Sequence, residues 1–165
     1  MAEVICDTSP LQYLFQLGLL DLLPSLFGGV VVPEAVVAEI AEGLRSGVRL
    51  PVLGSLSWVR VKRPEHPSLV RLLADLGPGE REVLALGSES PGALVILDDG
   101  LARRYALHLG LRLVGTLGVL LRAKRHGLLA AVRPLIEELA RLGFWVHPST
   151  REGLLRLAGE APSAP

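Results

Sequence analysis

Five short apolar runs, rich in valine, isoleucine and leucine, alternate along the chain with segments of helical periodicity. The runs are VIC at 4–6, VVV at 30–32, WVRV at 58–61, ALVIL at 93–97 and LRLV at 111–114. Near-continuous apolar runs of this length are typical of strands that helices cover on both faces, as in a parallel sheet. The pattern therefore predicts an α/β fold in which helices lie above and below a mainly parallel sheet.

Helical periodicity fills the intervals between these runs. A helix is expected from Ser9 to Leu23 with a break near Gly18, and another begins at Pro33, where proline suits a first turn. Further helices are predicted at 67–76, from Glu80 onward, from Asp99 to about 109, and near 117–126, 129–142 and 149–158. Residues 46–57 have the composition of a loop. We expect one domain over residues 1–160 and a flexible tail at 161–165.

Composition limits the classes of function. The chain has 165 residues, with 17 basic residues balanced by 17 acidic ones. It therefore lacks the surplus of positive charge with which a protein coats nucleic acid. Cys6 is the sole cysteine, which excludes an intrachain disulfide or a multi-cysteine zinc site. With neither a signal peptide nor a membrane-spanning apolar stretch in view, we expect a cytoplasmic protein that does not enter the membrane.

Acidic residues follow two of the predicted strands. The chain has five aspartates, and three of them come directly after apolar runs, namely Asp7, Asp98 and Asp99. The carboxyl ends of parallel strands border the ligand crevice, so these side chains are expected to converge there. Gathered carboxylates repel one another unless they are protonated, paired with a cation or neutralised by a metal ion. Their hard oxygen atoms suit Mg²⁺ or Mn²⁺.

Each aspartate also has a purely structural interpretation. An aspartate between a strand and a helix is often only an N-cap, and this is the better interpretation of each one taken singly. Glu39, Glu80 and Glu82 also lie on predicted helices, and together with the aspartates they favour a functional cluster. Glu39 alone could be a solvated residue on a mainly apolar helix.

These segments resemble the PIN-domain nucleases, and more closely the prokaryotic PIN-like proteins with a DTSPL start. The matching segments, which cover nearly the whole chain, are CDTSPLQYL at 6–14, VPEAVVAEI at 32–40, LGPGEREVLAL at 76–86, VILDDGLARRYA at 95–106, LVGTLGVLLRAKRHGLL at 113–129 and LGFWVHPSTREGLLRLAGE at 142–160. The resemblance implies a three-layer α/β/α sandwich and hydrolysis of RNA phosphodiester bonds. One or two Mg²⁺ or Mn²⁺ ions would be held in an acidic pocket.

The resemblance assigns the family's acidic positions residue by residue. Asp7 and Glu39 match the first two positions, Asp98 matches the fourth, and Asp99 lies beside it. The third position, where family members more often have aspartate, falls on Glu80 or Glu82, and the sequence does not choose between them. Asp7 and Asp98 would hold an ion that lowers the pKa of a bound water, and Glu39 would complete or orient the site. Asp99 and the third acidic residue could bind the ion directly, through water or not at all.

Candidate contacts to RNA come from hydroxyl groups and arginines. Ser9 and Thr116 match hydroxyl positions that line the family pocket. Arg103 and Arg104 follow the second aspartate pair and could hold phosphate, as could the cations Arg122, Lys124 and Arg125, although a solvated helix face or a salt bridge is an equal alternative for each. The aromatic residues Tyr13, Trp58 and Trp145 could stack on bases, but their neighbours favour packing in a core or an interface.

Other functions remain as alternatives. A receiver domain or a dehalogenase-like phosphatase also places aspartate and Mg²⁺ at strand ends, but DTSPL and GTLG stand where those families need a DxDx motif and a lysine. A non-catalytic PIN-like module that binds RNA or protein is a second alternative. The resemblance further implies a homodimer, and a toxin whose protein antitoxin inserts into the groove. The target RNA, single-stranded or structured, cannot be read from composition.

Overall fold

The computed structural model describes residues 2–160. One sheet of five parallel strands has the order β3-β2-β1-β4-β5, with the bounds β1 Val4–Cys6, β2 Val30–Pro33, β3 Val59–Lys62, β4 Leu94–Ile96 and β5 Arg112–Val114. Each strand overlaps one of the five apolar runs, so the predicted strands and the parallel sheet are confirmed. The predicted tail at 161–165 lies outside the described residues.

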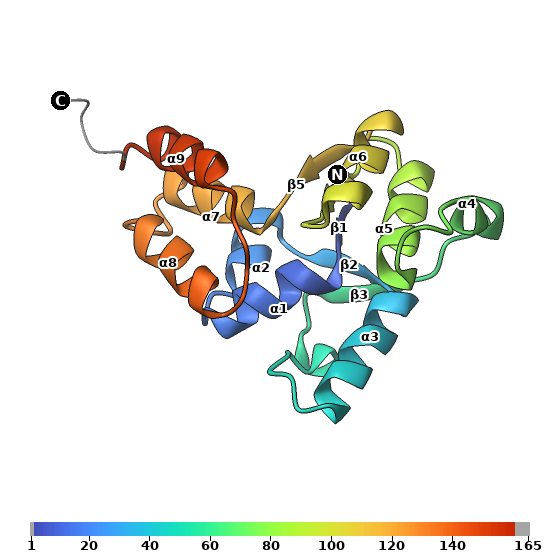
Figure 1. The fold of residues 1–165 in the computed structure, drawn as a ribbon. Helices are drawn as coiled ribbons and strands as arrows, with labels where there is room; N and C mark the ends of the chain where they lie inside the picture. Colours follow the sequence, from blue (N-terminus) through green and yellow to red (C-terminus); the bar gives the residue numbers. More distant parts are fainter. Residues whose placement is uncertain (1, 161–165) are drawn as a thin grey trace.

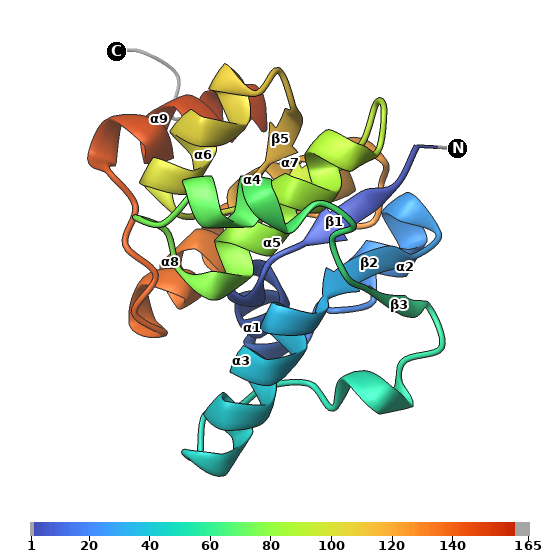
Figure 2. The same ribbon diagram turned by 90° about the vertical axis from the view of Figure 1, so that its right-hand side faces the viewer.

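Helices cover both faces of this sheet, as Figures 1 and 2 show. In the described part of the chain the helices are α1 Thr8–Gln16, α2 Leu22–Phe27, α3 Glu34–Arg45, α4 Pro67–Leu72, α5 Pro78–Glu89, α6 Gly100–His108, α7 Thr116–Arg125, α8 Arg133–Arg141 and α9 Pro148–Leu157. In Figure 1, α1, α2 and α7 lie on one side of the strands, and α5 and α6 lie on the other. The three-layer α/β/α arrangement is therefore confirmed.

Local sequence explains where several helices begin and end. The predicted break near Gly18 is present, because Gly18 has φ of +71°, which ends α1 and which L side chains rarely adopt. The helix expected at 129–142 begins only at Arg133. The reason is Pro134, which lacks a backbone donor and is tolerated only in the first turn of a helix.

The strand order creates a switch point between β1 and β4. The chain builds β2 and β3 on one side of β1 and then returns to build β4 and β5 on the other. Cys6 at the end of β1 pairs with Ile96 at the end of β4, so the residues that follow both strands emerge side by side. Ligands of open parallel sheets bind at such a point.

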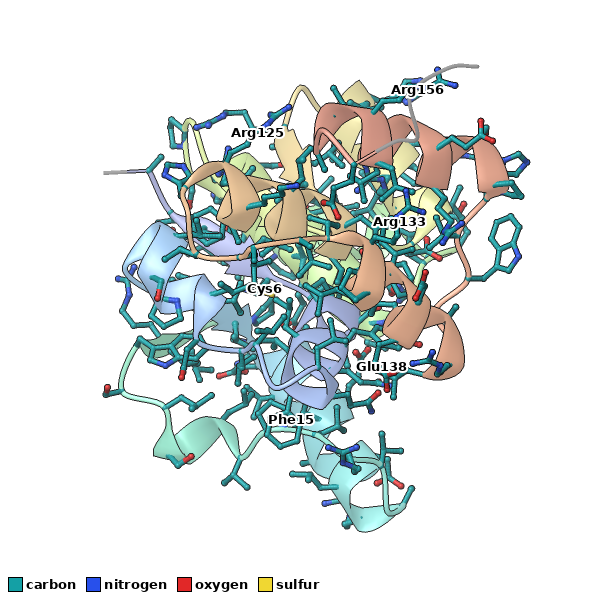
Figure 3. All side chains as sticks on the ribbon, turned by 90° about the vertical axis from the view of Figure 1, so that its left-hand side faces the viewer. Cys6, Phe15, Arg125, Arg133, Glu138 and Arg156 are labelled. Atoms are coloured by element: carbon teal, nitrogen blue, oxygen red, sulfur yellow. The ribbon has the colours of Figure 1, made fainter. Side chains whose placement is uncertain are left out.

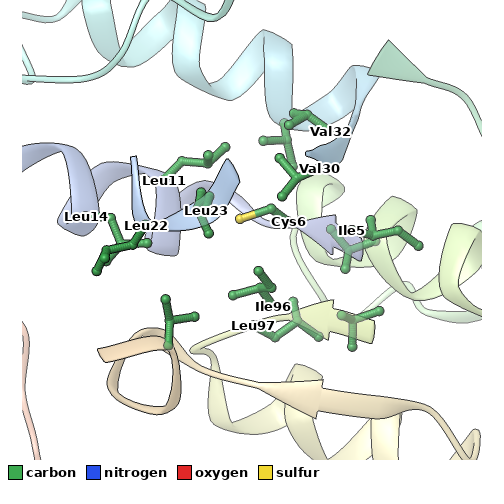
Figure 4. Packing of buried hydrophobic residues seen from close by; sticks show 14 of the residues in the cluster. Ile5, Cys6, Leu11, Leu14, Leu22, Leu23, Val30, Val32, Ile96 and Leu97 are labelled. Carbon is green, nitrogen blue, oxygen red and sulfur yellow. The ribbon is translucent and has the colours of Figure 1, made fainter. Parts of the chain in front are cut away.

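The core lies around the central strands β1, β2 and β4. Figure 4 shows Cys6 of β1 among Leu11, Leu23, Val30 and Ile96, which come from both neighbouring strands and from α1 and α2. All five side chains are buried. Burial raises the pKa of the Cys6 thiol well above its ordinary value, so the thiol is protonated and serves as a small apolar side chain.

Two cations on α7 have partners within the protein. Lys124 Nζ donates hydrogen bonds to Ala158 O at 2.6 Å and to Glu160 Oε2 at 2.8 Å, and Arg122 lies over the Phe27 ring at 5.5 Å. These contacts give both cations a structural role. Arg125 is exposed, and Figure 3 shows its side chain at the surface while Cys6 lies inside.

Glu160 joins the end of the described chain to the start of α8. It accepts hydrogen bonds from the backbone amides of Val132 and Arg133 at 2.8 and 3.1 Å, besides the one from Lys124. Burial raises the pKa of Glu160, but these hydrogen bonds outweigh burial and hold the pKa below its ordinary value. No helix in the described part of the chain combines the length and apolar character needed to cross a membrane.

We expect Glu160→Ala to lower the free energy of unfolding by about 1–3 kcal/mol, because two backbone donors and Lys124 lose their acceptor. Since the pKa of Glu160 is lower in the folded state, its contribution is present above its unfolded pKa and is lost as the pH falls through the folded pKa. Urea unfolding at pH 7 and in acid measures both effects. Glu152→Ala, which removes only an exposed pair with Arg156, is the control and should change stability little.

Candidate active site

The carboxyl ends of β1 and β4 bring two aspartates together. Asp7 follows β1 directly, and its backbone amide donates a hydrogen bond to Ile96 O at 3.1 Å. Asp98 follows β4 by one residue, and the Ser9 hydroxyl, two residues after Asp7, donates to Asp98 Oδ2 at 3.0 Å. The structure thus places Asp7 and Asp98 beside each other at the switch point of the sheet.

Asp7 is a buried carboxylate with one oxygen that no hydrogen-bond donor contacts. Its side chain is only 3% exposed, and Oδ1 is the one buried side-chain polar atom described that has no hydrogen-bond partner. Burial is the main cause that raises the pKa of Asp7 to about 8, and the charges of Glu80, Glu39 and Asp98 add to it. The Thr8 backbone amide offsets part of this effect. At neutral pH the isolated protein therefore keeps Asp7 mainly protonated.

Glu39 on α3 reaches the same place from another part of the chain. Its Oε1 accepts a hydrogen bond from the Gly79 amide at 2.9 Å, and its Oε2 accepts one from the Thr8 hydroxyl. A Cβ atom on Gly79 would lie 2.6 Å from Glu39 Oε2 and 3.0 Å from Asp7 Oδ1. Only glycine therefore lets both carboxylates approach this turn at the start of α5.

Asp98 has a full set of donors. Thr116 donates to it twice, from its backbone amide to Oδ1 at 2.7 Å and from its hydroxyl to Oδ2 at 2.6 Å. Ser9 supplies the third hydrogen bond. Because Thr116 is the first residue of α7, the positive end of this helix faces the carboxylate. Both hydroxyl residues that the resemblance placed in the pocket thus orient Asp98.

The structure distinguishes Glu80 from Glu82, which the sequence could not do. Glu80, in the first turn of α5, is half-buried, and burial together with the charges of Glu39 and Asp99 raises its pKa. Glu82 Oε2 instead accepts a hydrogen bond from the Ala35 amide at 2.8 Å, in the first turn of α3. Glu80 is thus the carboxylate whose charge acts on Asp7, and Glu82 has a partner in the helix start of α3.

Asp99 and the neighbouring arginines have different positions. Asp99 Oδ1 accepts a hydrogen bond from the Ala102 amide at 2.8 Å, so this residue is the N-cap of α6. Arg103 Nη1 donates to Leu97 O at 2.9 Å, and this side chain lines a hollow next to Asp98. Arg104 is exposed and does not line this hollow.

The hollow has a volume of about 760 Å³, and Asp98, Arg103 and Gly115 form the end of it that lies nearest the carboxylates. Its other wall comes from residues 144–157, including Trp145 and His147. Of the expectation that Trp145 packs in a core or an interface, the core is excluded, because the residue is 77% exposed, and the interface stays a prediction. Tyr13, in contrast, packs edge-to-face on Phe144, and Trp58 packs partly buried against the core.

Two residues of this site were missed by sequence reasoning. Gly79 and Thr8 carry no charge, so a pattern of acidic residues does not include them. The only signal was a glycine in the first turn of a helix, where it weakens the helix and therefore indicates a close approach of other atoms. Thr8 stands beside Asp7 in the DTSPL segment, but its hydrogen bond to Glu39 depends on the position of α3.

The donor set fits a hard divalent cation. Among residues 2–160, no three side chains of aspartate, glutamate, histidine or cysteine surround one point closely enough to hold an ion together. Mg²⁺ does not require such a cage, because it keeps several waters and is commonly held by one or two carboxylates and a substrate phosphate. A buried carboxylate oxygen without a donor, beside further carboxylates, is the ligand that such an ion needs.

A comparison with protein families agrees with this geometry. A family model for the PIN domain matches residues 3–160. The chain belongs to the PIN-domain family. No curated protein sequence matches the chain. PIN domains are generally nucleases, and they typically use divalent metal ions.

We expect the pH dependence of this PIN domain to report the state of Asp7. The folded-state pKa of about 8 lies above the ordinary 3.8, so the folded protein binds the extra proton. In EDTA, the free energy of unfolding of the wild type should fall as the pH rises from about 4 to 8. Over the same pH range, the free energy of unfolding of Asp7→Asn should change less. Urea unfolding measures this difference. Between pH 5 and pH 9, the stability of Asp7→Asn relative to the wild type should increase by at least about 1.4 kcal/mol, the equivalent of one pKa unit. Parallel pH profiles would contradict the assignment.

Gly79→Ala tests the approach of the two carboxylates. The added methyl group would displace Glu39 and Asp7, and we expect Mn²⁺ affinity to drop roughly 10- to 100-fold, as for the loss of groups that orient metal ligands. Alanine suits a helix better than glycine, so the fold should persist. Calorimetric titration with Mn²⁺ measures the change. Gly54→Ala is the control, because a Cβ there meets no atom within 4 Å, and it should bind Mn²⁺ as the wild type does.

Proposed function

We propose that this PIN domain is a divalent-metal-dependent ribonuclease that hydrolyses phosphodiester bonds at the carboxyl ends of β1 and β4. The observation that carries the proposal is Asp7 Oδ1, a buried carboxylate oxygen without a donor, surrounded by other carboxylates. Such an arrangement is costly in the isolated protein, and a bound cation removes the cost. Membership of a family of nucleases supports the same conclusion.

Asp7 and Asp98 would hold the ion, Mg²⁺ or Mn²⁺. Glu39 would complete the site, since the Thr8 hydroxyl and the Gly79 amide fix its orientation. When bound, the ion would act as a Lewis acid on the phosphate and would lower the pKa of a water. Glu80 is the third acidic residue in this proposal, and Glu82 and Asp99 serve the helix starts of α3 and α6.

The chain's own residues prepare the site for this chemistry. Ser9 and Thr116 fix Asp98 in one orientation through three hydrogen bonds, so its position does not depend on the ion. Asp7 must lose its proton before it binds the ion, which links metal binding to proton release. Arg103, whose guanidinium still has donors to spare, stands where it can contact a phosphate of the substrate.

Two alternatives are weaker. A receiver-like phosphotransfer domain needs a lysine after the last strand, but Gly115 and Thr116 follow β5, and the backbone there contacts Asp98. A non-catalytic binding module would not need a carboxylate that remains without a donor in the core. RNA as the substrate, the homodimer and the protein antitoxin rest on the family resemblance and remain predictions.

Cleavage of RNA by the purified protein tests the proposal. We expect mixed single-stranded RNAs to be cut with Mn²⁺ or Mg²⁺ and to remain intact with EDTA. Asp7→Asn and Asp98→Asn should each abolish detectable cleavage, and Thr116→Val, which removes an orienting hydroxyl, should reduce kcat/KM roughly 10- to 100-fold. Asp21→Asn is the control, because this aspartate is exposed at the start of α2, away from the site. Equal cleavage by Asp7→Asn and the wild type, or cleavage in EDTA, contradicts the mechanism.

A further inference from the structure

Trp145 is a large aromatic side chain that the fold leaves in solvent. It is 77% exposed, although burying its ring would contribute more to stability than burying most other side chains. The other tryptophan of the chain, Trp58, packs partly buried against the core. An exposed tryptophan therefore needs an explanation beyond folding.

The segment that carries Trp145 is held in place by its neighbours. Phe144 packs edge-to-face on Tyr13 of α1, with ring centroids 4.9 Å apart and an interplanar angle of 83°. The Phe144 amide also donates to Leu139 O of α8 at 2.9 Å. On the other side, His147 packs edge-to-face against Trp145 itself at 5.8 Å. The indole is thus presented from a fixed segment, with one edge against an imidazole.

The position of Trp145 connects it to the proposed active site. Trp145 and His147 line the same 760 Å³ hollow as Asp98 and Arg103. This volume lies within the range of roughly 300–1,000 Å³ that is usual for sites that bind small ligands. The lining of the hollow therefore offers a carboxylate, a guanidinium and an aromatic surface.

We infer that Trp145 binds a nucleobase of single-stranded RNA next to the phosphate that is cleaved, with the base stacked on the indole ring. The inference rests on the proposed function, because the stacked base lies next to the cleaved phosphate only if Asp98 belongs to the site at which RNA is cleaved. Every base has an aromatic face that stacks on tryptophan, and only an unpaired strand can present it. Arg103 lines the same hollow and would contact the phosphate backbone of the bound strand.

A protein partner is the other class of ligand for an exposed tryptophan. Apolar contact with the wall of the hollow would hold such a partner, whereas the guanidinium of Arg103 adds a cation that suits an anionic ligand. A hollow lined by an aromatic ring, a guanidinium and the carboxylate of Asp98 matches an oligonucleotide, which alternates aromatic bases with anionic phosphates.

Fluorescence quenching tests the stacking without relying on catalysis. In a Trp58→Phe, Asp7→Asn background with EDTA, oligoadenylate remains intact and Trp145 is the only tryptophan. We expect saturable quenching by single-stranded oligoadenylate and none by the same RNA in a duplex. A fluorescently labelled oligoadenylate should bind Trp145→Ala roughly 5- to 150-fold more weakly, as is usual for the loss of one stacked base. Trp145→Phe should recover part of the affinity.

Leu72→Ala provides the matched control, because Leu72 is as exposed as Trp145 but lies on α4 and does not line the hollow. It should bind oligoadenylate as the parent protein does. Absence of quenching, or equal affinity of Trp145→Ala, overturns the inference even if the wild type cleaves RNA, and would assign the surface to a protein partner. Quenching that depends on Trp145 supports base stacking on this residue even if no cleavage is found, and in that case only the placement next to a cleaved phosphate fails together with the proposed function.

Discussion

The buried carboxylate of Asp7 is the constraint on which the rest of the site depends. Placing an acidic group in the core without a donor is unfavourable, and the neighbouring carboxylates increase the cost. The isolated protein reduces this cost by keeping the proton on Asp7. A fold that retains such a group sacrifices stability at one point, and functional sites are where proteins commonly do so.

The topology explains why Asp7 is the carboxylate that is buried at an energetic cost. The central strand β1 ends at the switch point of the sheet, so the residue after it is enclosed by β4 and by the starts of α1 and α5. The carboxylates around it come from distant segments, and Glu39 and Asp98 each have donors of their own. Their orientations are thus set by the protein. Asp7 Oδ1 lacks a hydrogen-bond partner, which makes this oxygen the contact that an added cation would take.

Much of the fold could be predicted from the sequence, because the largely buried strands β1, β2 and β4 leave continuous apolar runs. The placement of Asp7 and Asp98 after such runs followed from the same pattern. The choice between Glu80 and Glu82 did not, since two residues differ by about 200° around a helix and only the packing of α5 decides which one faces Asp7. The exposure of Trp145 was also beyond the sequence, because an aromatic residue between apolar neighbours usually packs inside. Lys124 could be assigned only once Glu160 was located beside it.

The central claim is that Asp7 is a ligand of the proposed divalent metal ion. A crystal structure of the protein grown with Mn²⁺, with anomalous diffraction recorded for manganese, tests this claim most directly. The account predicts an anomalous peak in contact with Asp7 Oδ1 and on the side of Asp98 and Glu39. Manganese that binds only elsewhere, or an Asp7 Oδ1 that accepts a hydrogen bond from a protein donor instead, would contradict it.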